Sequence, residues 1–273
     1  MLEIGDKRVF VTGGASGIGR AIIEALLAKG AKVLFCDVNA DAGKGLETEL
    51  RKQYGADRVI FAQCDVTNAQ QLEDVFQKAV SSFGGLDVCV NNAGILDERI
   101  WETMLAINTT AQIRGCKLAL DHMRRDKGGR GGVIINVASM AGIVAAHYHP
   151  VYTASKHAVV GFSLSWATHP KMGEMGVRWG CLCPGPVDTK LITVLEEGQA
   201  ENLPVYRHVL DTNKVPPESA AQAFIRLLED DESNGGLMTV VAGREQGHYR
   251  KRQLVDADGV SNPRLADIPW TPT

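Results

Sequence analysis

The sequence predicts an α/β protein in which a parallel sheet of about seven strands carries helices on both faces. Three observations favour this fold class. Short β-rich runs alternate with longer helical segments, the strand-like runs are apolar throughout, and no repeat or low-complexity linker interrupts the series. Strands that are covered on both faces need such continuous apolar runs, so we expect a doubly wound sheet with right-handed crossovers.

Strand-like runs occur seven times along the chain. They cover residues 8–13, 32–38, 58–66, 86–94, 132–139, 177–185 and 236–243. The helical segments between them are expected at 18–30, 40–54, 70–84, about 101–125 and about 150–171, with another helix after residue 216. Because parallel neighbours in a sheet need long crossover connections, this alternation predicts parallel pairing.

The series indicates one domain over residues 1–250, followed by a C-terminal tail over 251–273. Two stretches fall outside the alternation. Residues 188–216 are polar and irregular between the sixth strand and the next helix. The chain after Gly243 carries scattered charges and three prolines, so we expect it to be loosely packed or dependent on assembly.

Composition excludes several classes of function. The net charge of −3 comes from mixed signs along the chain, which indicates neither a nucleic-acid surface nor a face attracted to a membrane. No leader and no apolar run long enough to span a bilayer is present. The six cysteines form no CxxC pair and lie mostly in or beside apolar runs. We therefore expect reduced, buried thiols, no metal site and a cytoplasmic protein.

A glycine-rich turn, VTGGASGIG at residues 11–19, joins the first strand to the first helix. Glycines at positions 13, 17 and 19 allow a tight turn and a close approach of the backbone to a pyrophosphate. The helix N-terminus beyond the turn offers N–H donors and a favourable dipole. In this context the motif predicts a nucleotide site and a Rossmann fold.

Asp37 ends the second strand about 18 residues after Gly19. A carboxylate at this point accepts hydrogen bonds from the adenosine ribose and repels a 2′-phosphate, and its neighbours Val38 and Asn39 offer no cation. The cofactor is therefore expected to be NAD rather than NADP. The alternative is that Asp37 only caps the following helix.

Two later strand ends carry polar residues with two interpretations each. Asp65 either accepts from the adenine amino group or caps the helix that starts near Asn68. Asn91 and Asn92 either order the backbone around the cofactor, at the sheet edge where ligands bind, or are purely structural.

The run SMAGIVAAHYHPVYTASK, residues 139–156, contains Ser139, Tyr152 and Lys156. On a helix, Tyr152 and Lys156 share one face because they are four residues apart. A phenol is a poor base at neutral pH unless its anion is stabilised, and a nearby ammonium stabilises it. The pair suits removal of a proton from an alcohol. The alternative is a helix with a half-buried tyrosine and a surface lysine.

Together these motifs resemble the short-chain dehydrogenase/reductase family. The family's order is matched over about residues 5–245 by TGGASGIG, Asp37, the NNAG run at 91–94, Asn108, Ser139, Tyr152-x-x-x-Lys156 and PGPVDT at 184–189. The runs LLAKGAKV, INVASMAG, PVYTASKHAVVGF and LLEDDESNG narrow the resemblance to NAD-dependent members that oxidise the 15-hydroxyl group of prostaglandins.

The resemblance implies NAD-dependent oxidation of a secondary alcohol, of the prostaglandin or hydroxy fatty acid type, to a ketone. Two alternatives stay open. The same chemistry could act on a steroid, retinoid, terpenoid or simple alcohol, or the chain could be an inactive, NAD-binding member of the family.

The resemblance also implies roles for single residues. Tyr152 would be the acid/base, Lys156 would lower its pKa and hold the nicotinamide ribose, and Ser139 would bond the reacting oxygen. Asn108 would position a water of the proton relay. Residues expected to contact the cofactor are Gly13, Ser16, Gly17, Ile18, Gly19, Asp37, Asp65, Val66, Asn92, Tyr152, Lys156, Val187 and Thr189.

Two neighbouring positions depart from the prostaglandin-oxidising members. They carry a pair of glutamines where this chain has Tyr148 and His149. His149 is therefore the candidate that, with Ser139 and Tyr152, contacts the substrate hydroxyl. Imidazole can donate or accept a hydrogen bond and titrates near neutral pH. The alternative is a solvated loop residue.

Two further expectations follow from the resemblance. Residues 188–216 would form a lid over an apolar alcohol or ketone, or else a surface helix that packs on the core. Family members commonly pair through the helices at 101–125 and 152–171, so a homodimer is expected, with a tetramer as the next alternative. Phe162 and Trp166 would lie in that interface or in the core.

Overall fold

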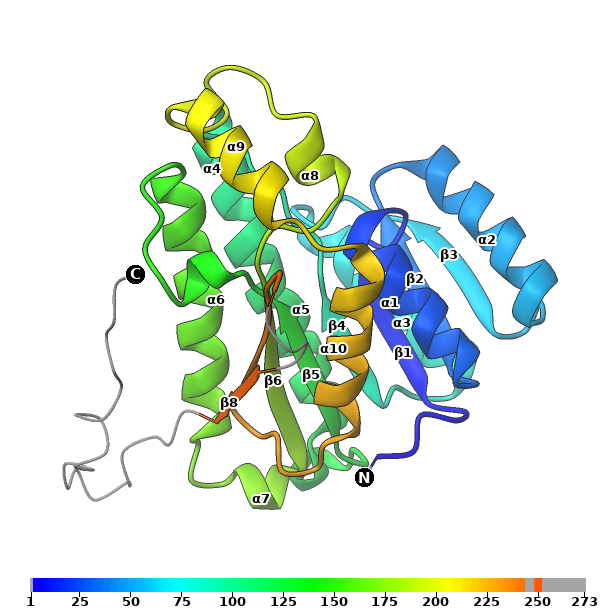
Figure 1. Cartoon of the computed structure of the whole chain (residues 1–273). Helices are drawn as coiled ribbons and strands as arrows, with labels where there is room; N and C mark the ends of the chain where they lie inside the picture. The colour runs from blue at the N-terminus through cyan, green and yellow to red at the C-terminus, as the bar shows by residue number, and fades with distance from the viewer. Residues whose placement is uncertain (1, 244–247, 252–273) are drawn as a thin grey trace.

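The computed structural model describes residues 2–243 and 248–251. One central sheet runs through it, in the order β3-β2-β1-β4-β5-β6-β7-β8, with helices in front and behind (Figure 1). The strands are β1 (Arg8–Thr12), β2 (Lys32–Asp37), β3 (Val59–Gln63), β4 (Val88–Asn91), β5 (Gly132–Val137), β6 (Val177–Pro184), β7 (Gly236–Val240) and β8 (His248–Lys251).

The helices follow the predicted alternation. They are α1 (Gly17–Ala28), α2 (Ala40–Tyr54), α3 (Ala69–Phe83), α4 (Trp101–Leu105), α5 (Gln112–Met123), α6 (Pro150–Ala167), α7 (Met172–Met175), α8 (Lys190–Thr193), α9 (Leu203–Asn213) and α10 (Pro217–Glu229). Short 3-10 turns cover Glu98–Ile100, Arg125–Lys127 and Met140–Gly142, and a π-helical turn covers Ala106–Ala111.

Strands β1 to β7 pair in parallel, which confirms the predicted sheet. The eighth strand was not expected. β8 pairs antiparallel with β7, so residues 248–251 differ from the loosely packed chain predicted after Gly243, and β8 spans the predicted boundary at residue 250. The open edge of β7 offers the backbone partners that fix this segment, which composition does not reveal. The rest of the predicted tail, 252–273, lies outside the described residues.

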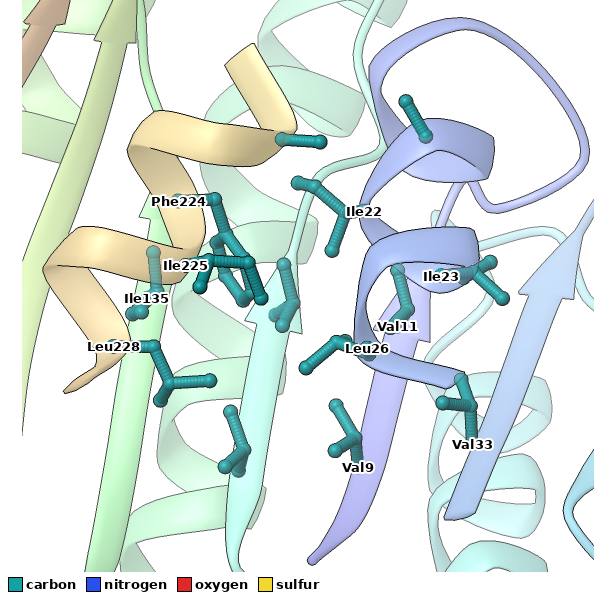
Figure 2. Packing of buried hydrophobic residues seen from close by; sticks show 14 of the residues in the cluster. Val9, Val11, Ile22, Ile23, Leu26, Val33, Ile135, Phe224, Ile225 and Leu228 are labelled. Atoms are coloured by element: carbon teal, nitrogen blue, oxygen red, sulfur yellow. The ribbon is translucent and has the colours of Figure 1, made fainter. Parts of the chain in front are cut away.

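Alternate residues of each strand enter different cores. Val9 and Val11 of β1 pack beneath α1, α2 and α10, whereas Phe10 between them packs on the other side with α3 and α5. Figure 2 shows Phe224 and Leu228 of α10 beside the side chains of α1 on the first face. Helix α6 covers the second face at β6 and β7. Burial on both faces is why the strands read as continuous apolar runs.

Two predicted helices are interrupted. The helix expected at 101–125 contains the π-helical turn between α4 and α5, which carries Asn108. The helix expected at 150–171 ends at Ala167, shortly before Pro170, and α7 follows it. A residue that precedes proline is disfavoured in the α conformation, which accounts for the second break.

The stretch 188–216, irregular in sequence, contains α8 and α9, so part of it is helical, as the lid and the surface-helix interpretations both allow. Its apolar residues at helical spacing turn inward. Those that are buried are Ile192, Leu195, Leu203, Tyr206 and Leu210, whereas Val194 and Val205 face outward. We call residues 188–216 the lid segment.

All six cysteines are buried, as predicted, and none is joined to another in a disulfide. Within residues 2–243 and 248–251, no helix is both long and apolar enough to cross a membrane.

Ile22 and Ile100 allow a matched test of the packing. Ile22 of α1 is 0% exposed in the core of Figure 2, whereas Ile100 is 47% exposed. Ile22→Ala is expected to lower the free energy of unfolding by about 2–5 kcal/mol, because it removes buried methyl groups and leaves a cavity. Ile100→Ala is expected to change it by less than about 1 kcal/mol. Urea denaturation measures both, and equal losses would contradict this packing.

Candidate active site

One cavity of about 640 Å³ lies at the carboxyl edge of the sheet, where the strand order reverses between β1 and β4. Parallel strands bring their carboxyl ends together at this edge, which is where such sheets bind ligands. The predicted residues that line it are Gly13, Ser16, Gly17, Ile18, Asp37, Asp65, Val66, Asn92, Ser139, His149, Tyr152, Lys156, Val187 and Thr189. The other two predicted residues, Gly19 and Asn108, do not line it.

The glycine turn is held against the end of β4. Gly13 has a φ of 65°, and a Cβ there would lie 2.7 Å from the Ala93 Cα. The Asn92 side-chain amide donates to the carbonyls of Thr12 (3.0 Å) and Gly13 (2.8 Å). Asn92 therefore orders the backbone of the turn. Gly19 serves the same packing, since a Cβ there would lie 2.2 Å from the Gly13 oxygen.

Of the two interpretations of Asn91, the structure supports the purely structural role. It is 1% exposed, and its amide donates to Asn136 Oδ1 (2.9 Å) and Cys116 Sγ (3.3 Å). The Asn136 amide in turn donates to Ser163 Oγ of α6 at 2.8 Å. The network ties β4 and β5 to α5 and α6 beneath the cavity.

The N-terminus of α1 opens onto the cavity. Its N-cap residue, Ser16, makes no side-chain capping bond, and the first turn contains no acidic residue. The first N–H groups of a helix lack intrahelical acceptors and carry a partial positive charge. This end of α1 is therefore suited to an anionic group such as a pyrophosphate.

Asp37 does not cap α2. Asn39 does, by accepting from the Ala42 N–H at 3.0 Å. The Asp37 carboxylate accepts from the N–H groups of Ala15 (3.1 Å) and Asn39 (3.0 Å) and lines the cavity. No arginine lines the described part of the cavity. The carboxylate is thus placed to accept ribose hydroxyls.

Asp65 does not cap α3 either. Asn68 accepts from the Gln71 N–H at 3.1 Å, whereas Asp65 Oδ1 accepts from the N–H and the hydroxyl of Thr67 at 2.9 and 2.7 Å. Because Asp65 also lines the cavity beside Val66, the capping interpretation is wrong.

Tyr152 and Lys156 are both buried on α6, with exposed fractions of 6% and 3%, so the surface-lysine interpretation is wrong. The Lys156 Nζ lies 5.6 Å from the centre of the Tyr152 ring and donates to the Val137 carbonyl at 3.0 Å. Ser139 lines the same cavity, and its Oγ accepts from the Ala141 N–H at 3.1 Å.

Burial shifts both ionisable groups toward their neutral forms. It raises the pKa of Tyr152 to about 12, while a hydrogen bond with Ser139 opposes the rise. It lowers the pKa of Lys156 from 10.5 to about 8. Desolvation disfavours charge in both cases. Both side chains are therefore shifted toward their neutral forms, and any positive charge added beside Tyr152 would favour its phenolate.

Asn108 lies directly behind this pair and is fully buried. Its Oδ1 accepts from the Ile95 N–H at 2.9 Å, and its amide donates to the Ile95 carbonyl at 2.9 Å and to Ser155 Oγ at 3.2 Å. A Cβ on Gly94 would lie 3.3 Å from Asn108 Oδ1 and 3.4 Å from Lys156 Nζ. Asn108 and Lys156 thus face one small space that glycine keeps open.

His149 is not a solvated loop residue, since it is only 4% exposed. Its Nδ1 lies 3.2 Å from Thr153 Oγ1, and its ring centre lies 5.1 Å from those of both Tyr152 and Tyr206. Tyr206 of α9 also stacks on Tyr148 at 4.9 Å. Burial lowers the pKa of His149, so a neutral imidazole faces the cavity at pH 7.

Two residues of the site had no signal in the sequence. Tyr206 was only one of several apolar residues in the lid segment, and its ring contacts come from the fold. Glu98 accepts from the N–H groups of Val151 (3.1 Å) and Tyr152 (2.9 Å), 54 residues away from Tyr152. No local pattern marks such a contact. In the described part of the chain, no group of three or more histidine, cysteine or acidic side chains could hold a metal ion.

Comparisons with known proteins show which family this chain resembles. The profile of the short chain dehydrogenase family matches residues 7–200. The 15-hydroxyprostaglandin dehydrogenase [NAD(+)] of Homo sapiens is 41% identical, covering 89% of this chain and 94% of its own. The 3beta-hydroxysteroid dehydrogenase 2 of Eggerthella lenta is 34% identical, covering 88% and 95%.

A solved structure shares the fold. The short chain dehydrogenase/reductase from Burkholderia phymatum, crystallised in complex with NAD, matches with a TM-score of 0.72 at 24% identity. The match covers 83% of this chain and 87% of that one.

The pKa of Lys156 is expected to be near 8 rather than the usual 10.5, because its ammonium is desolvated. In the protein without bound cofactor, Lys156 should therefore lose its proton mostly between pH 7 and 9, at lower pH than exposed lysines do. NMR titration of the lysine side chains measures this, and Lys156→Arg identifies the signal by its disappearance. An unshifted midpoint would contradict a desolvated site.

Proposed function

This chain belongs to the short-chain dehydrogenase/reductase family, and on that premise we propose that it is an NAD-dependent dehydrogenase that oxidises a secondary alcohol to a ketone. The observation that carries the proposal is the burial of Tyr152 beside Lys156 in the wall of a cavity that the glycine turn also lines. Such a site can hold a nucleotide cofactor and an alcohol together and move the alcohol's proton.

The residues present fit NAD. The α1 N-terminus, without a capping side chain or acidic first turn, suits the pyrophosphate, and Asp37 suits ribose hydroxyls while repelling a 2′-phosphate. Asp65 and Val66 would contact the adenine, Val187 and Thr189 the carboxamide end. When bound, NAD supplies the hydride acceptor. The names of 15-hydroxyprostaglandin dehydrogenases from several mammals specify the same cofactor.

The chain's own residues would handle the proton. Tyr152 would accept the hydroxyl proton, Lys156 would stabilise the phenolate through its ammonium, and Ser139 would donate to the reacting oxygen. The space shared by Asn108 Oδ1 and Lys156 Nζ would hold a water that passes the proton onward. Because the pKa of Tyr152 lies above pH 7, oxidation should speed up and ketone reduction should slow down from pH 7 toward pH 8. The gain should end above that pH, since Lys156, with a pKa of about 8, loses the ammonium charge that stabilises the phenolate.

The substrate proposed is an apolar alcohol of the prostaglandin or hydroxy fatty acid type. Its support is the 41% identity to a prostaglandin dehydrogenase, together with the apolar wall formed by Leu96, Ile192 and Leu210. His149 would contact the hydroxyl group in place of a glutamine. A steroid is the second candidate, because a 3beta-hydroxysteroid dehydrogenase is 34% identical. An inactive, NAD-binding protein would have no need of the four catalytic residues.

The proposal also includes the assembly and the location of the protein, which we propose to be a homodimer in the cytoplasm. Ile100 and Trp101, at the start of the helix expected to pair, are 47% and 48% exposed and could meet a second copy. Phe162 and Trp166 instead pack on Trp179 within the chain, at 6.0 and 5.8 Å between ring centres. A sedimentation mass of twice the 29.4 kDa of one chain would support the dimer, and a mass equal to that of one chain would refute it.

A screen of prostaglandins, hydroxy fatty acids, steroids, retinol and short alcohols, each with NAD and with NADP, tests the proposal. NADH absorbance is expected with an apolar secondary alcohol. Tyr152→Phe is expected to lower turnover by about a thousandfold or more while NAD binding is retained, because the phenolic oxygen is the proton acceptor. Undiminished turnover, or a clear preference for NADP, would contradict the assignment. NAD binding without turnover on any alcohol would favour the inactive alternative.

His149→Ala tests the substrate contact. The Michaelis constant for the best alcohol is expected to rise roughly tenfold with NAD affinity unchanged, since one hydrogen bond to the substrate is lost. His149→Gln is expected to restore part of it. His157→Ala is the matched control, because His157 is exposed on the same helix. If His149→Ala and His157→Ala behave alike, His149 does not hold the substrate.

A further inference from the structure

We propose that Glu98 is a positioning residue that holds Tyr152 in its reactive place and connects the lid segment to the catalytic helix. This inference rests on the proposed function. Glu98 lies in the 3-10 turn Glu98–Ile100, in the loop between β4 and α4, and it does not line the cavity. It would therefore act through Tyr152 rather than on the substrate.

Helix α6 begins without a cap from its own sequence. The N-cap residue, His149, makes no side-chain capping bond, and the first turn contains no acidic residue. Pro150 has no N–H, and the Thr153 N–H already donates to the His149 carbonyl at 2.9 Å. Only the N–H groups of Val151 and Tyr152 remain without an acceptor inside the helix.

Glu98 supplies both acceptors. Its Oε1 accepts from the Tyr152 N–H at 2.9 Å, and its Oε2 accepts from the Val151 N–H at 3.1 Å. A carboxylate at a helix N-terminus also meets the positive end of the helix dipole, and hydrogen bonds to a charged group are stronger than neutral ones. One side chain therefore replaces the whole local cap.

The position of Tyr152 in the helix makes this contact matter. Tyr152 is the third residue of α6, so no earlier helical turn holds its backbone. Lys156 and Ser155 lie one turn further in, and each has its own anchor, at the Val137 carbonyl and at Asn108. Without Glu98 the first turn could fray, and the phenol would move relative to Lys156. A misplacement of about 1 Å can slow a reaction a hundredfold.

The other side of Glu98 is bound to the lid segment. The Glu98 N–H donates to the Gln199 carbonyl at 3.1 Å, and the Gln199 side-chain amide donates to Asp97 Oδ2 at 2.9 Å. Arg99 pairs with Asp97 at 2.8 Å and with Glu196 at 3.3 Å. Residues 97–99 thus contact the lid segment through their backbone and side chains alike.

Asp97 keeps this contact in place. The Arg99 guanidinium and the Gln199 amide lower the pKa of Asp97 to about 2, so it stays ionised in any working buffer. A second contact, from the Glu201 N–H to the Tyr148 carbonyl at 2.6 Å, ties the lid segment to the loop before α6. Docking of the lid over a substrate would therefore also hold Glu98 against Tyr152.

Two substitutions measure the effect in the full chain, with NAD and the best alcohol from the screen. Glu98→Gln keeps one acceptor oxygen, so kcat is expected to fall about tenfold; Glu98→Ala keeps none, so kcat is expected to fall further, toward a hundredfold. The Michaelis constant for the alcohol and the NAD dissociation constant are expected to stay within about twofold. Glu102→Gln, an exposed glutamate one helical turn further on, is the control and should leave all three values unchanged.

A purely structural role predicts something else. In that case the kcat of each variant would fall only as far as the amount of NAD bound per chain falls, and this result would overturn the proposal. A wild-type kcat in Glu98→Gln would overturn it as well. If both Glu98 variants fail to fold, Gln199→Ala replaces them. It is expected to lower kcat about threefold at full NAD stoichiometry, and an unchanged kcat would overturn the coupling. Absence of turnover in the unsubstituted protein would instead overturn the proposed function, and this inference with it.

Discussion

The burial of Lys156 beside Tyr152 is the constraint on which the rest of the structure depends. A desolvated ammonium is costly unless it is hydrogen-bonded, and here it donates to the Val137 carbonyl at the end of β5. That bond requires α6 to lie close against the sheet at this height. The bonds from Asn91 through Asn136 to Ser163 hold it there. The polar core beneath the cavity thus supports the proposed catalytic geometry.

The same constraint explains the interruption in the neighbouring helix. The π-helical turn brings Asn108 to the carbonyl and N–H of Ile95, which fixes the loop after β4 beside Gly94. Gly94 then leaves room between Asn108 Oδ1 and Lys156 Nζ. A regular helix from 101 to 125 would place the amide differently, since a π turn shifts the residues that follow it. The helix irregularity is therefore linked to the proton transfer proposed at this site.

Patterns local in sequence were predictive, and those that depend on a distant partner were not. The continuous apolar runs predicted β1 to β7, and the glycine turn and Asp37 lie together as expected. Asp37 and Asp65 could each also have been a helix cap by their positions in the sequence. In the structure Asn39 caps α2 and Asn68 caps α3, so neither aspartate has that role. Composition could not reveal β8, because its pairing depends on the free edge of β7.

The sequence by itself determined the fold class, the nucleotide turn and the spacing of Tyr152 and Lys156, because each depends on residues within one strand, turn or helix. Only the tertiary structure decided what surrounds them. Glu98, 54 residues before Tyr152, caps α6, and Tyr206 of the lid segment packs against His149. No helical or strand periodicity relates the residues that make such contacts. The contacts form only when the sheet brings their segments together.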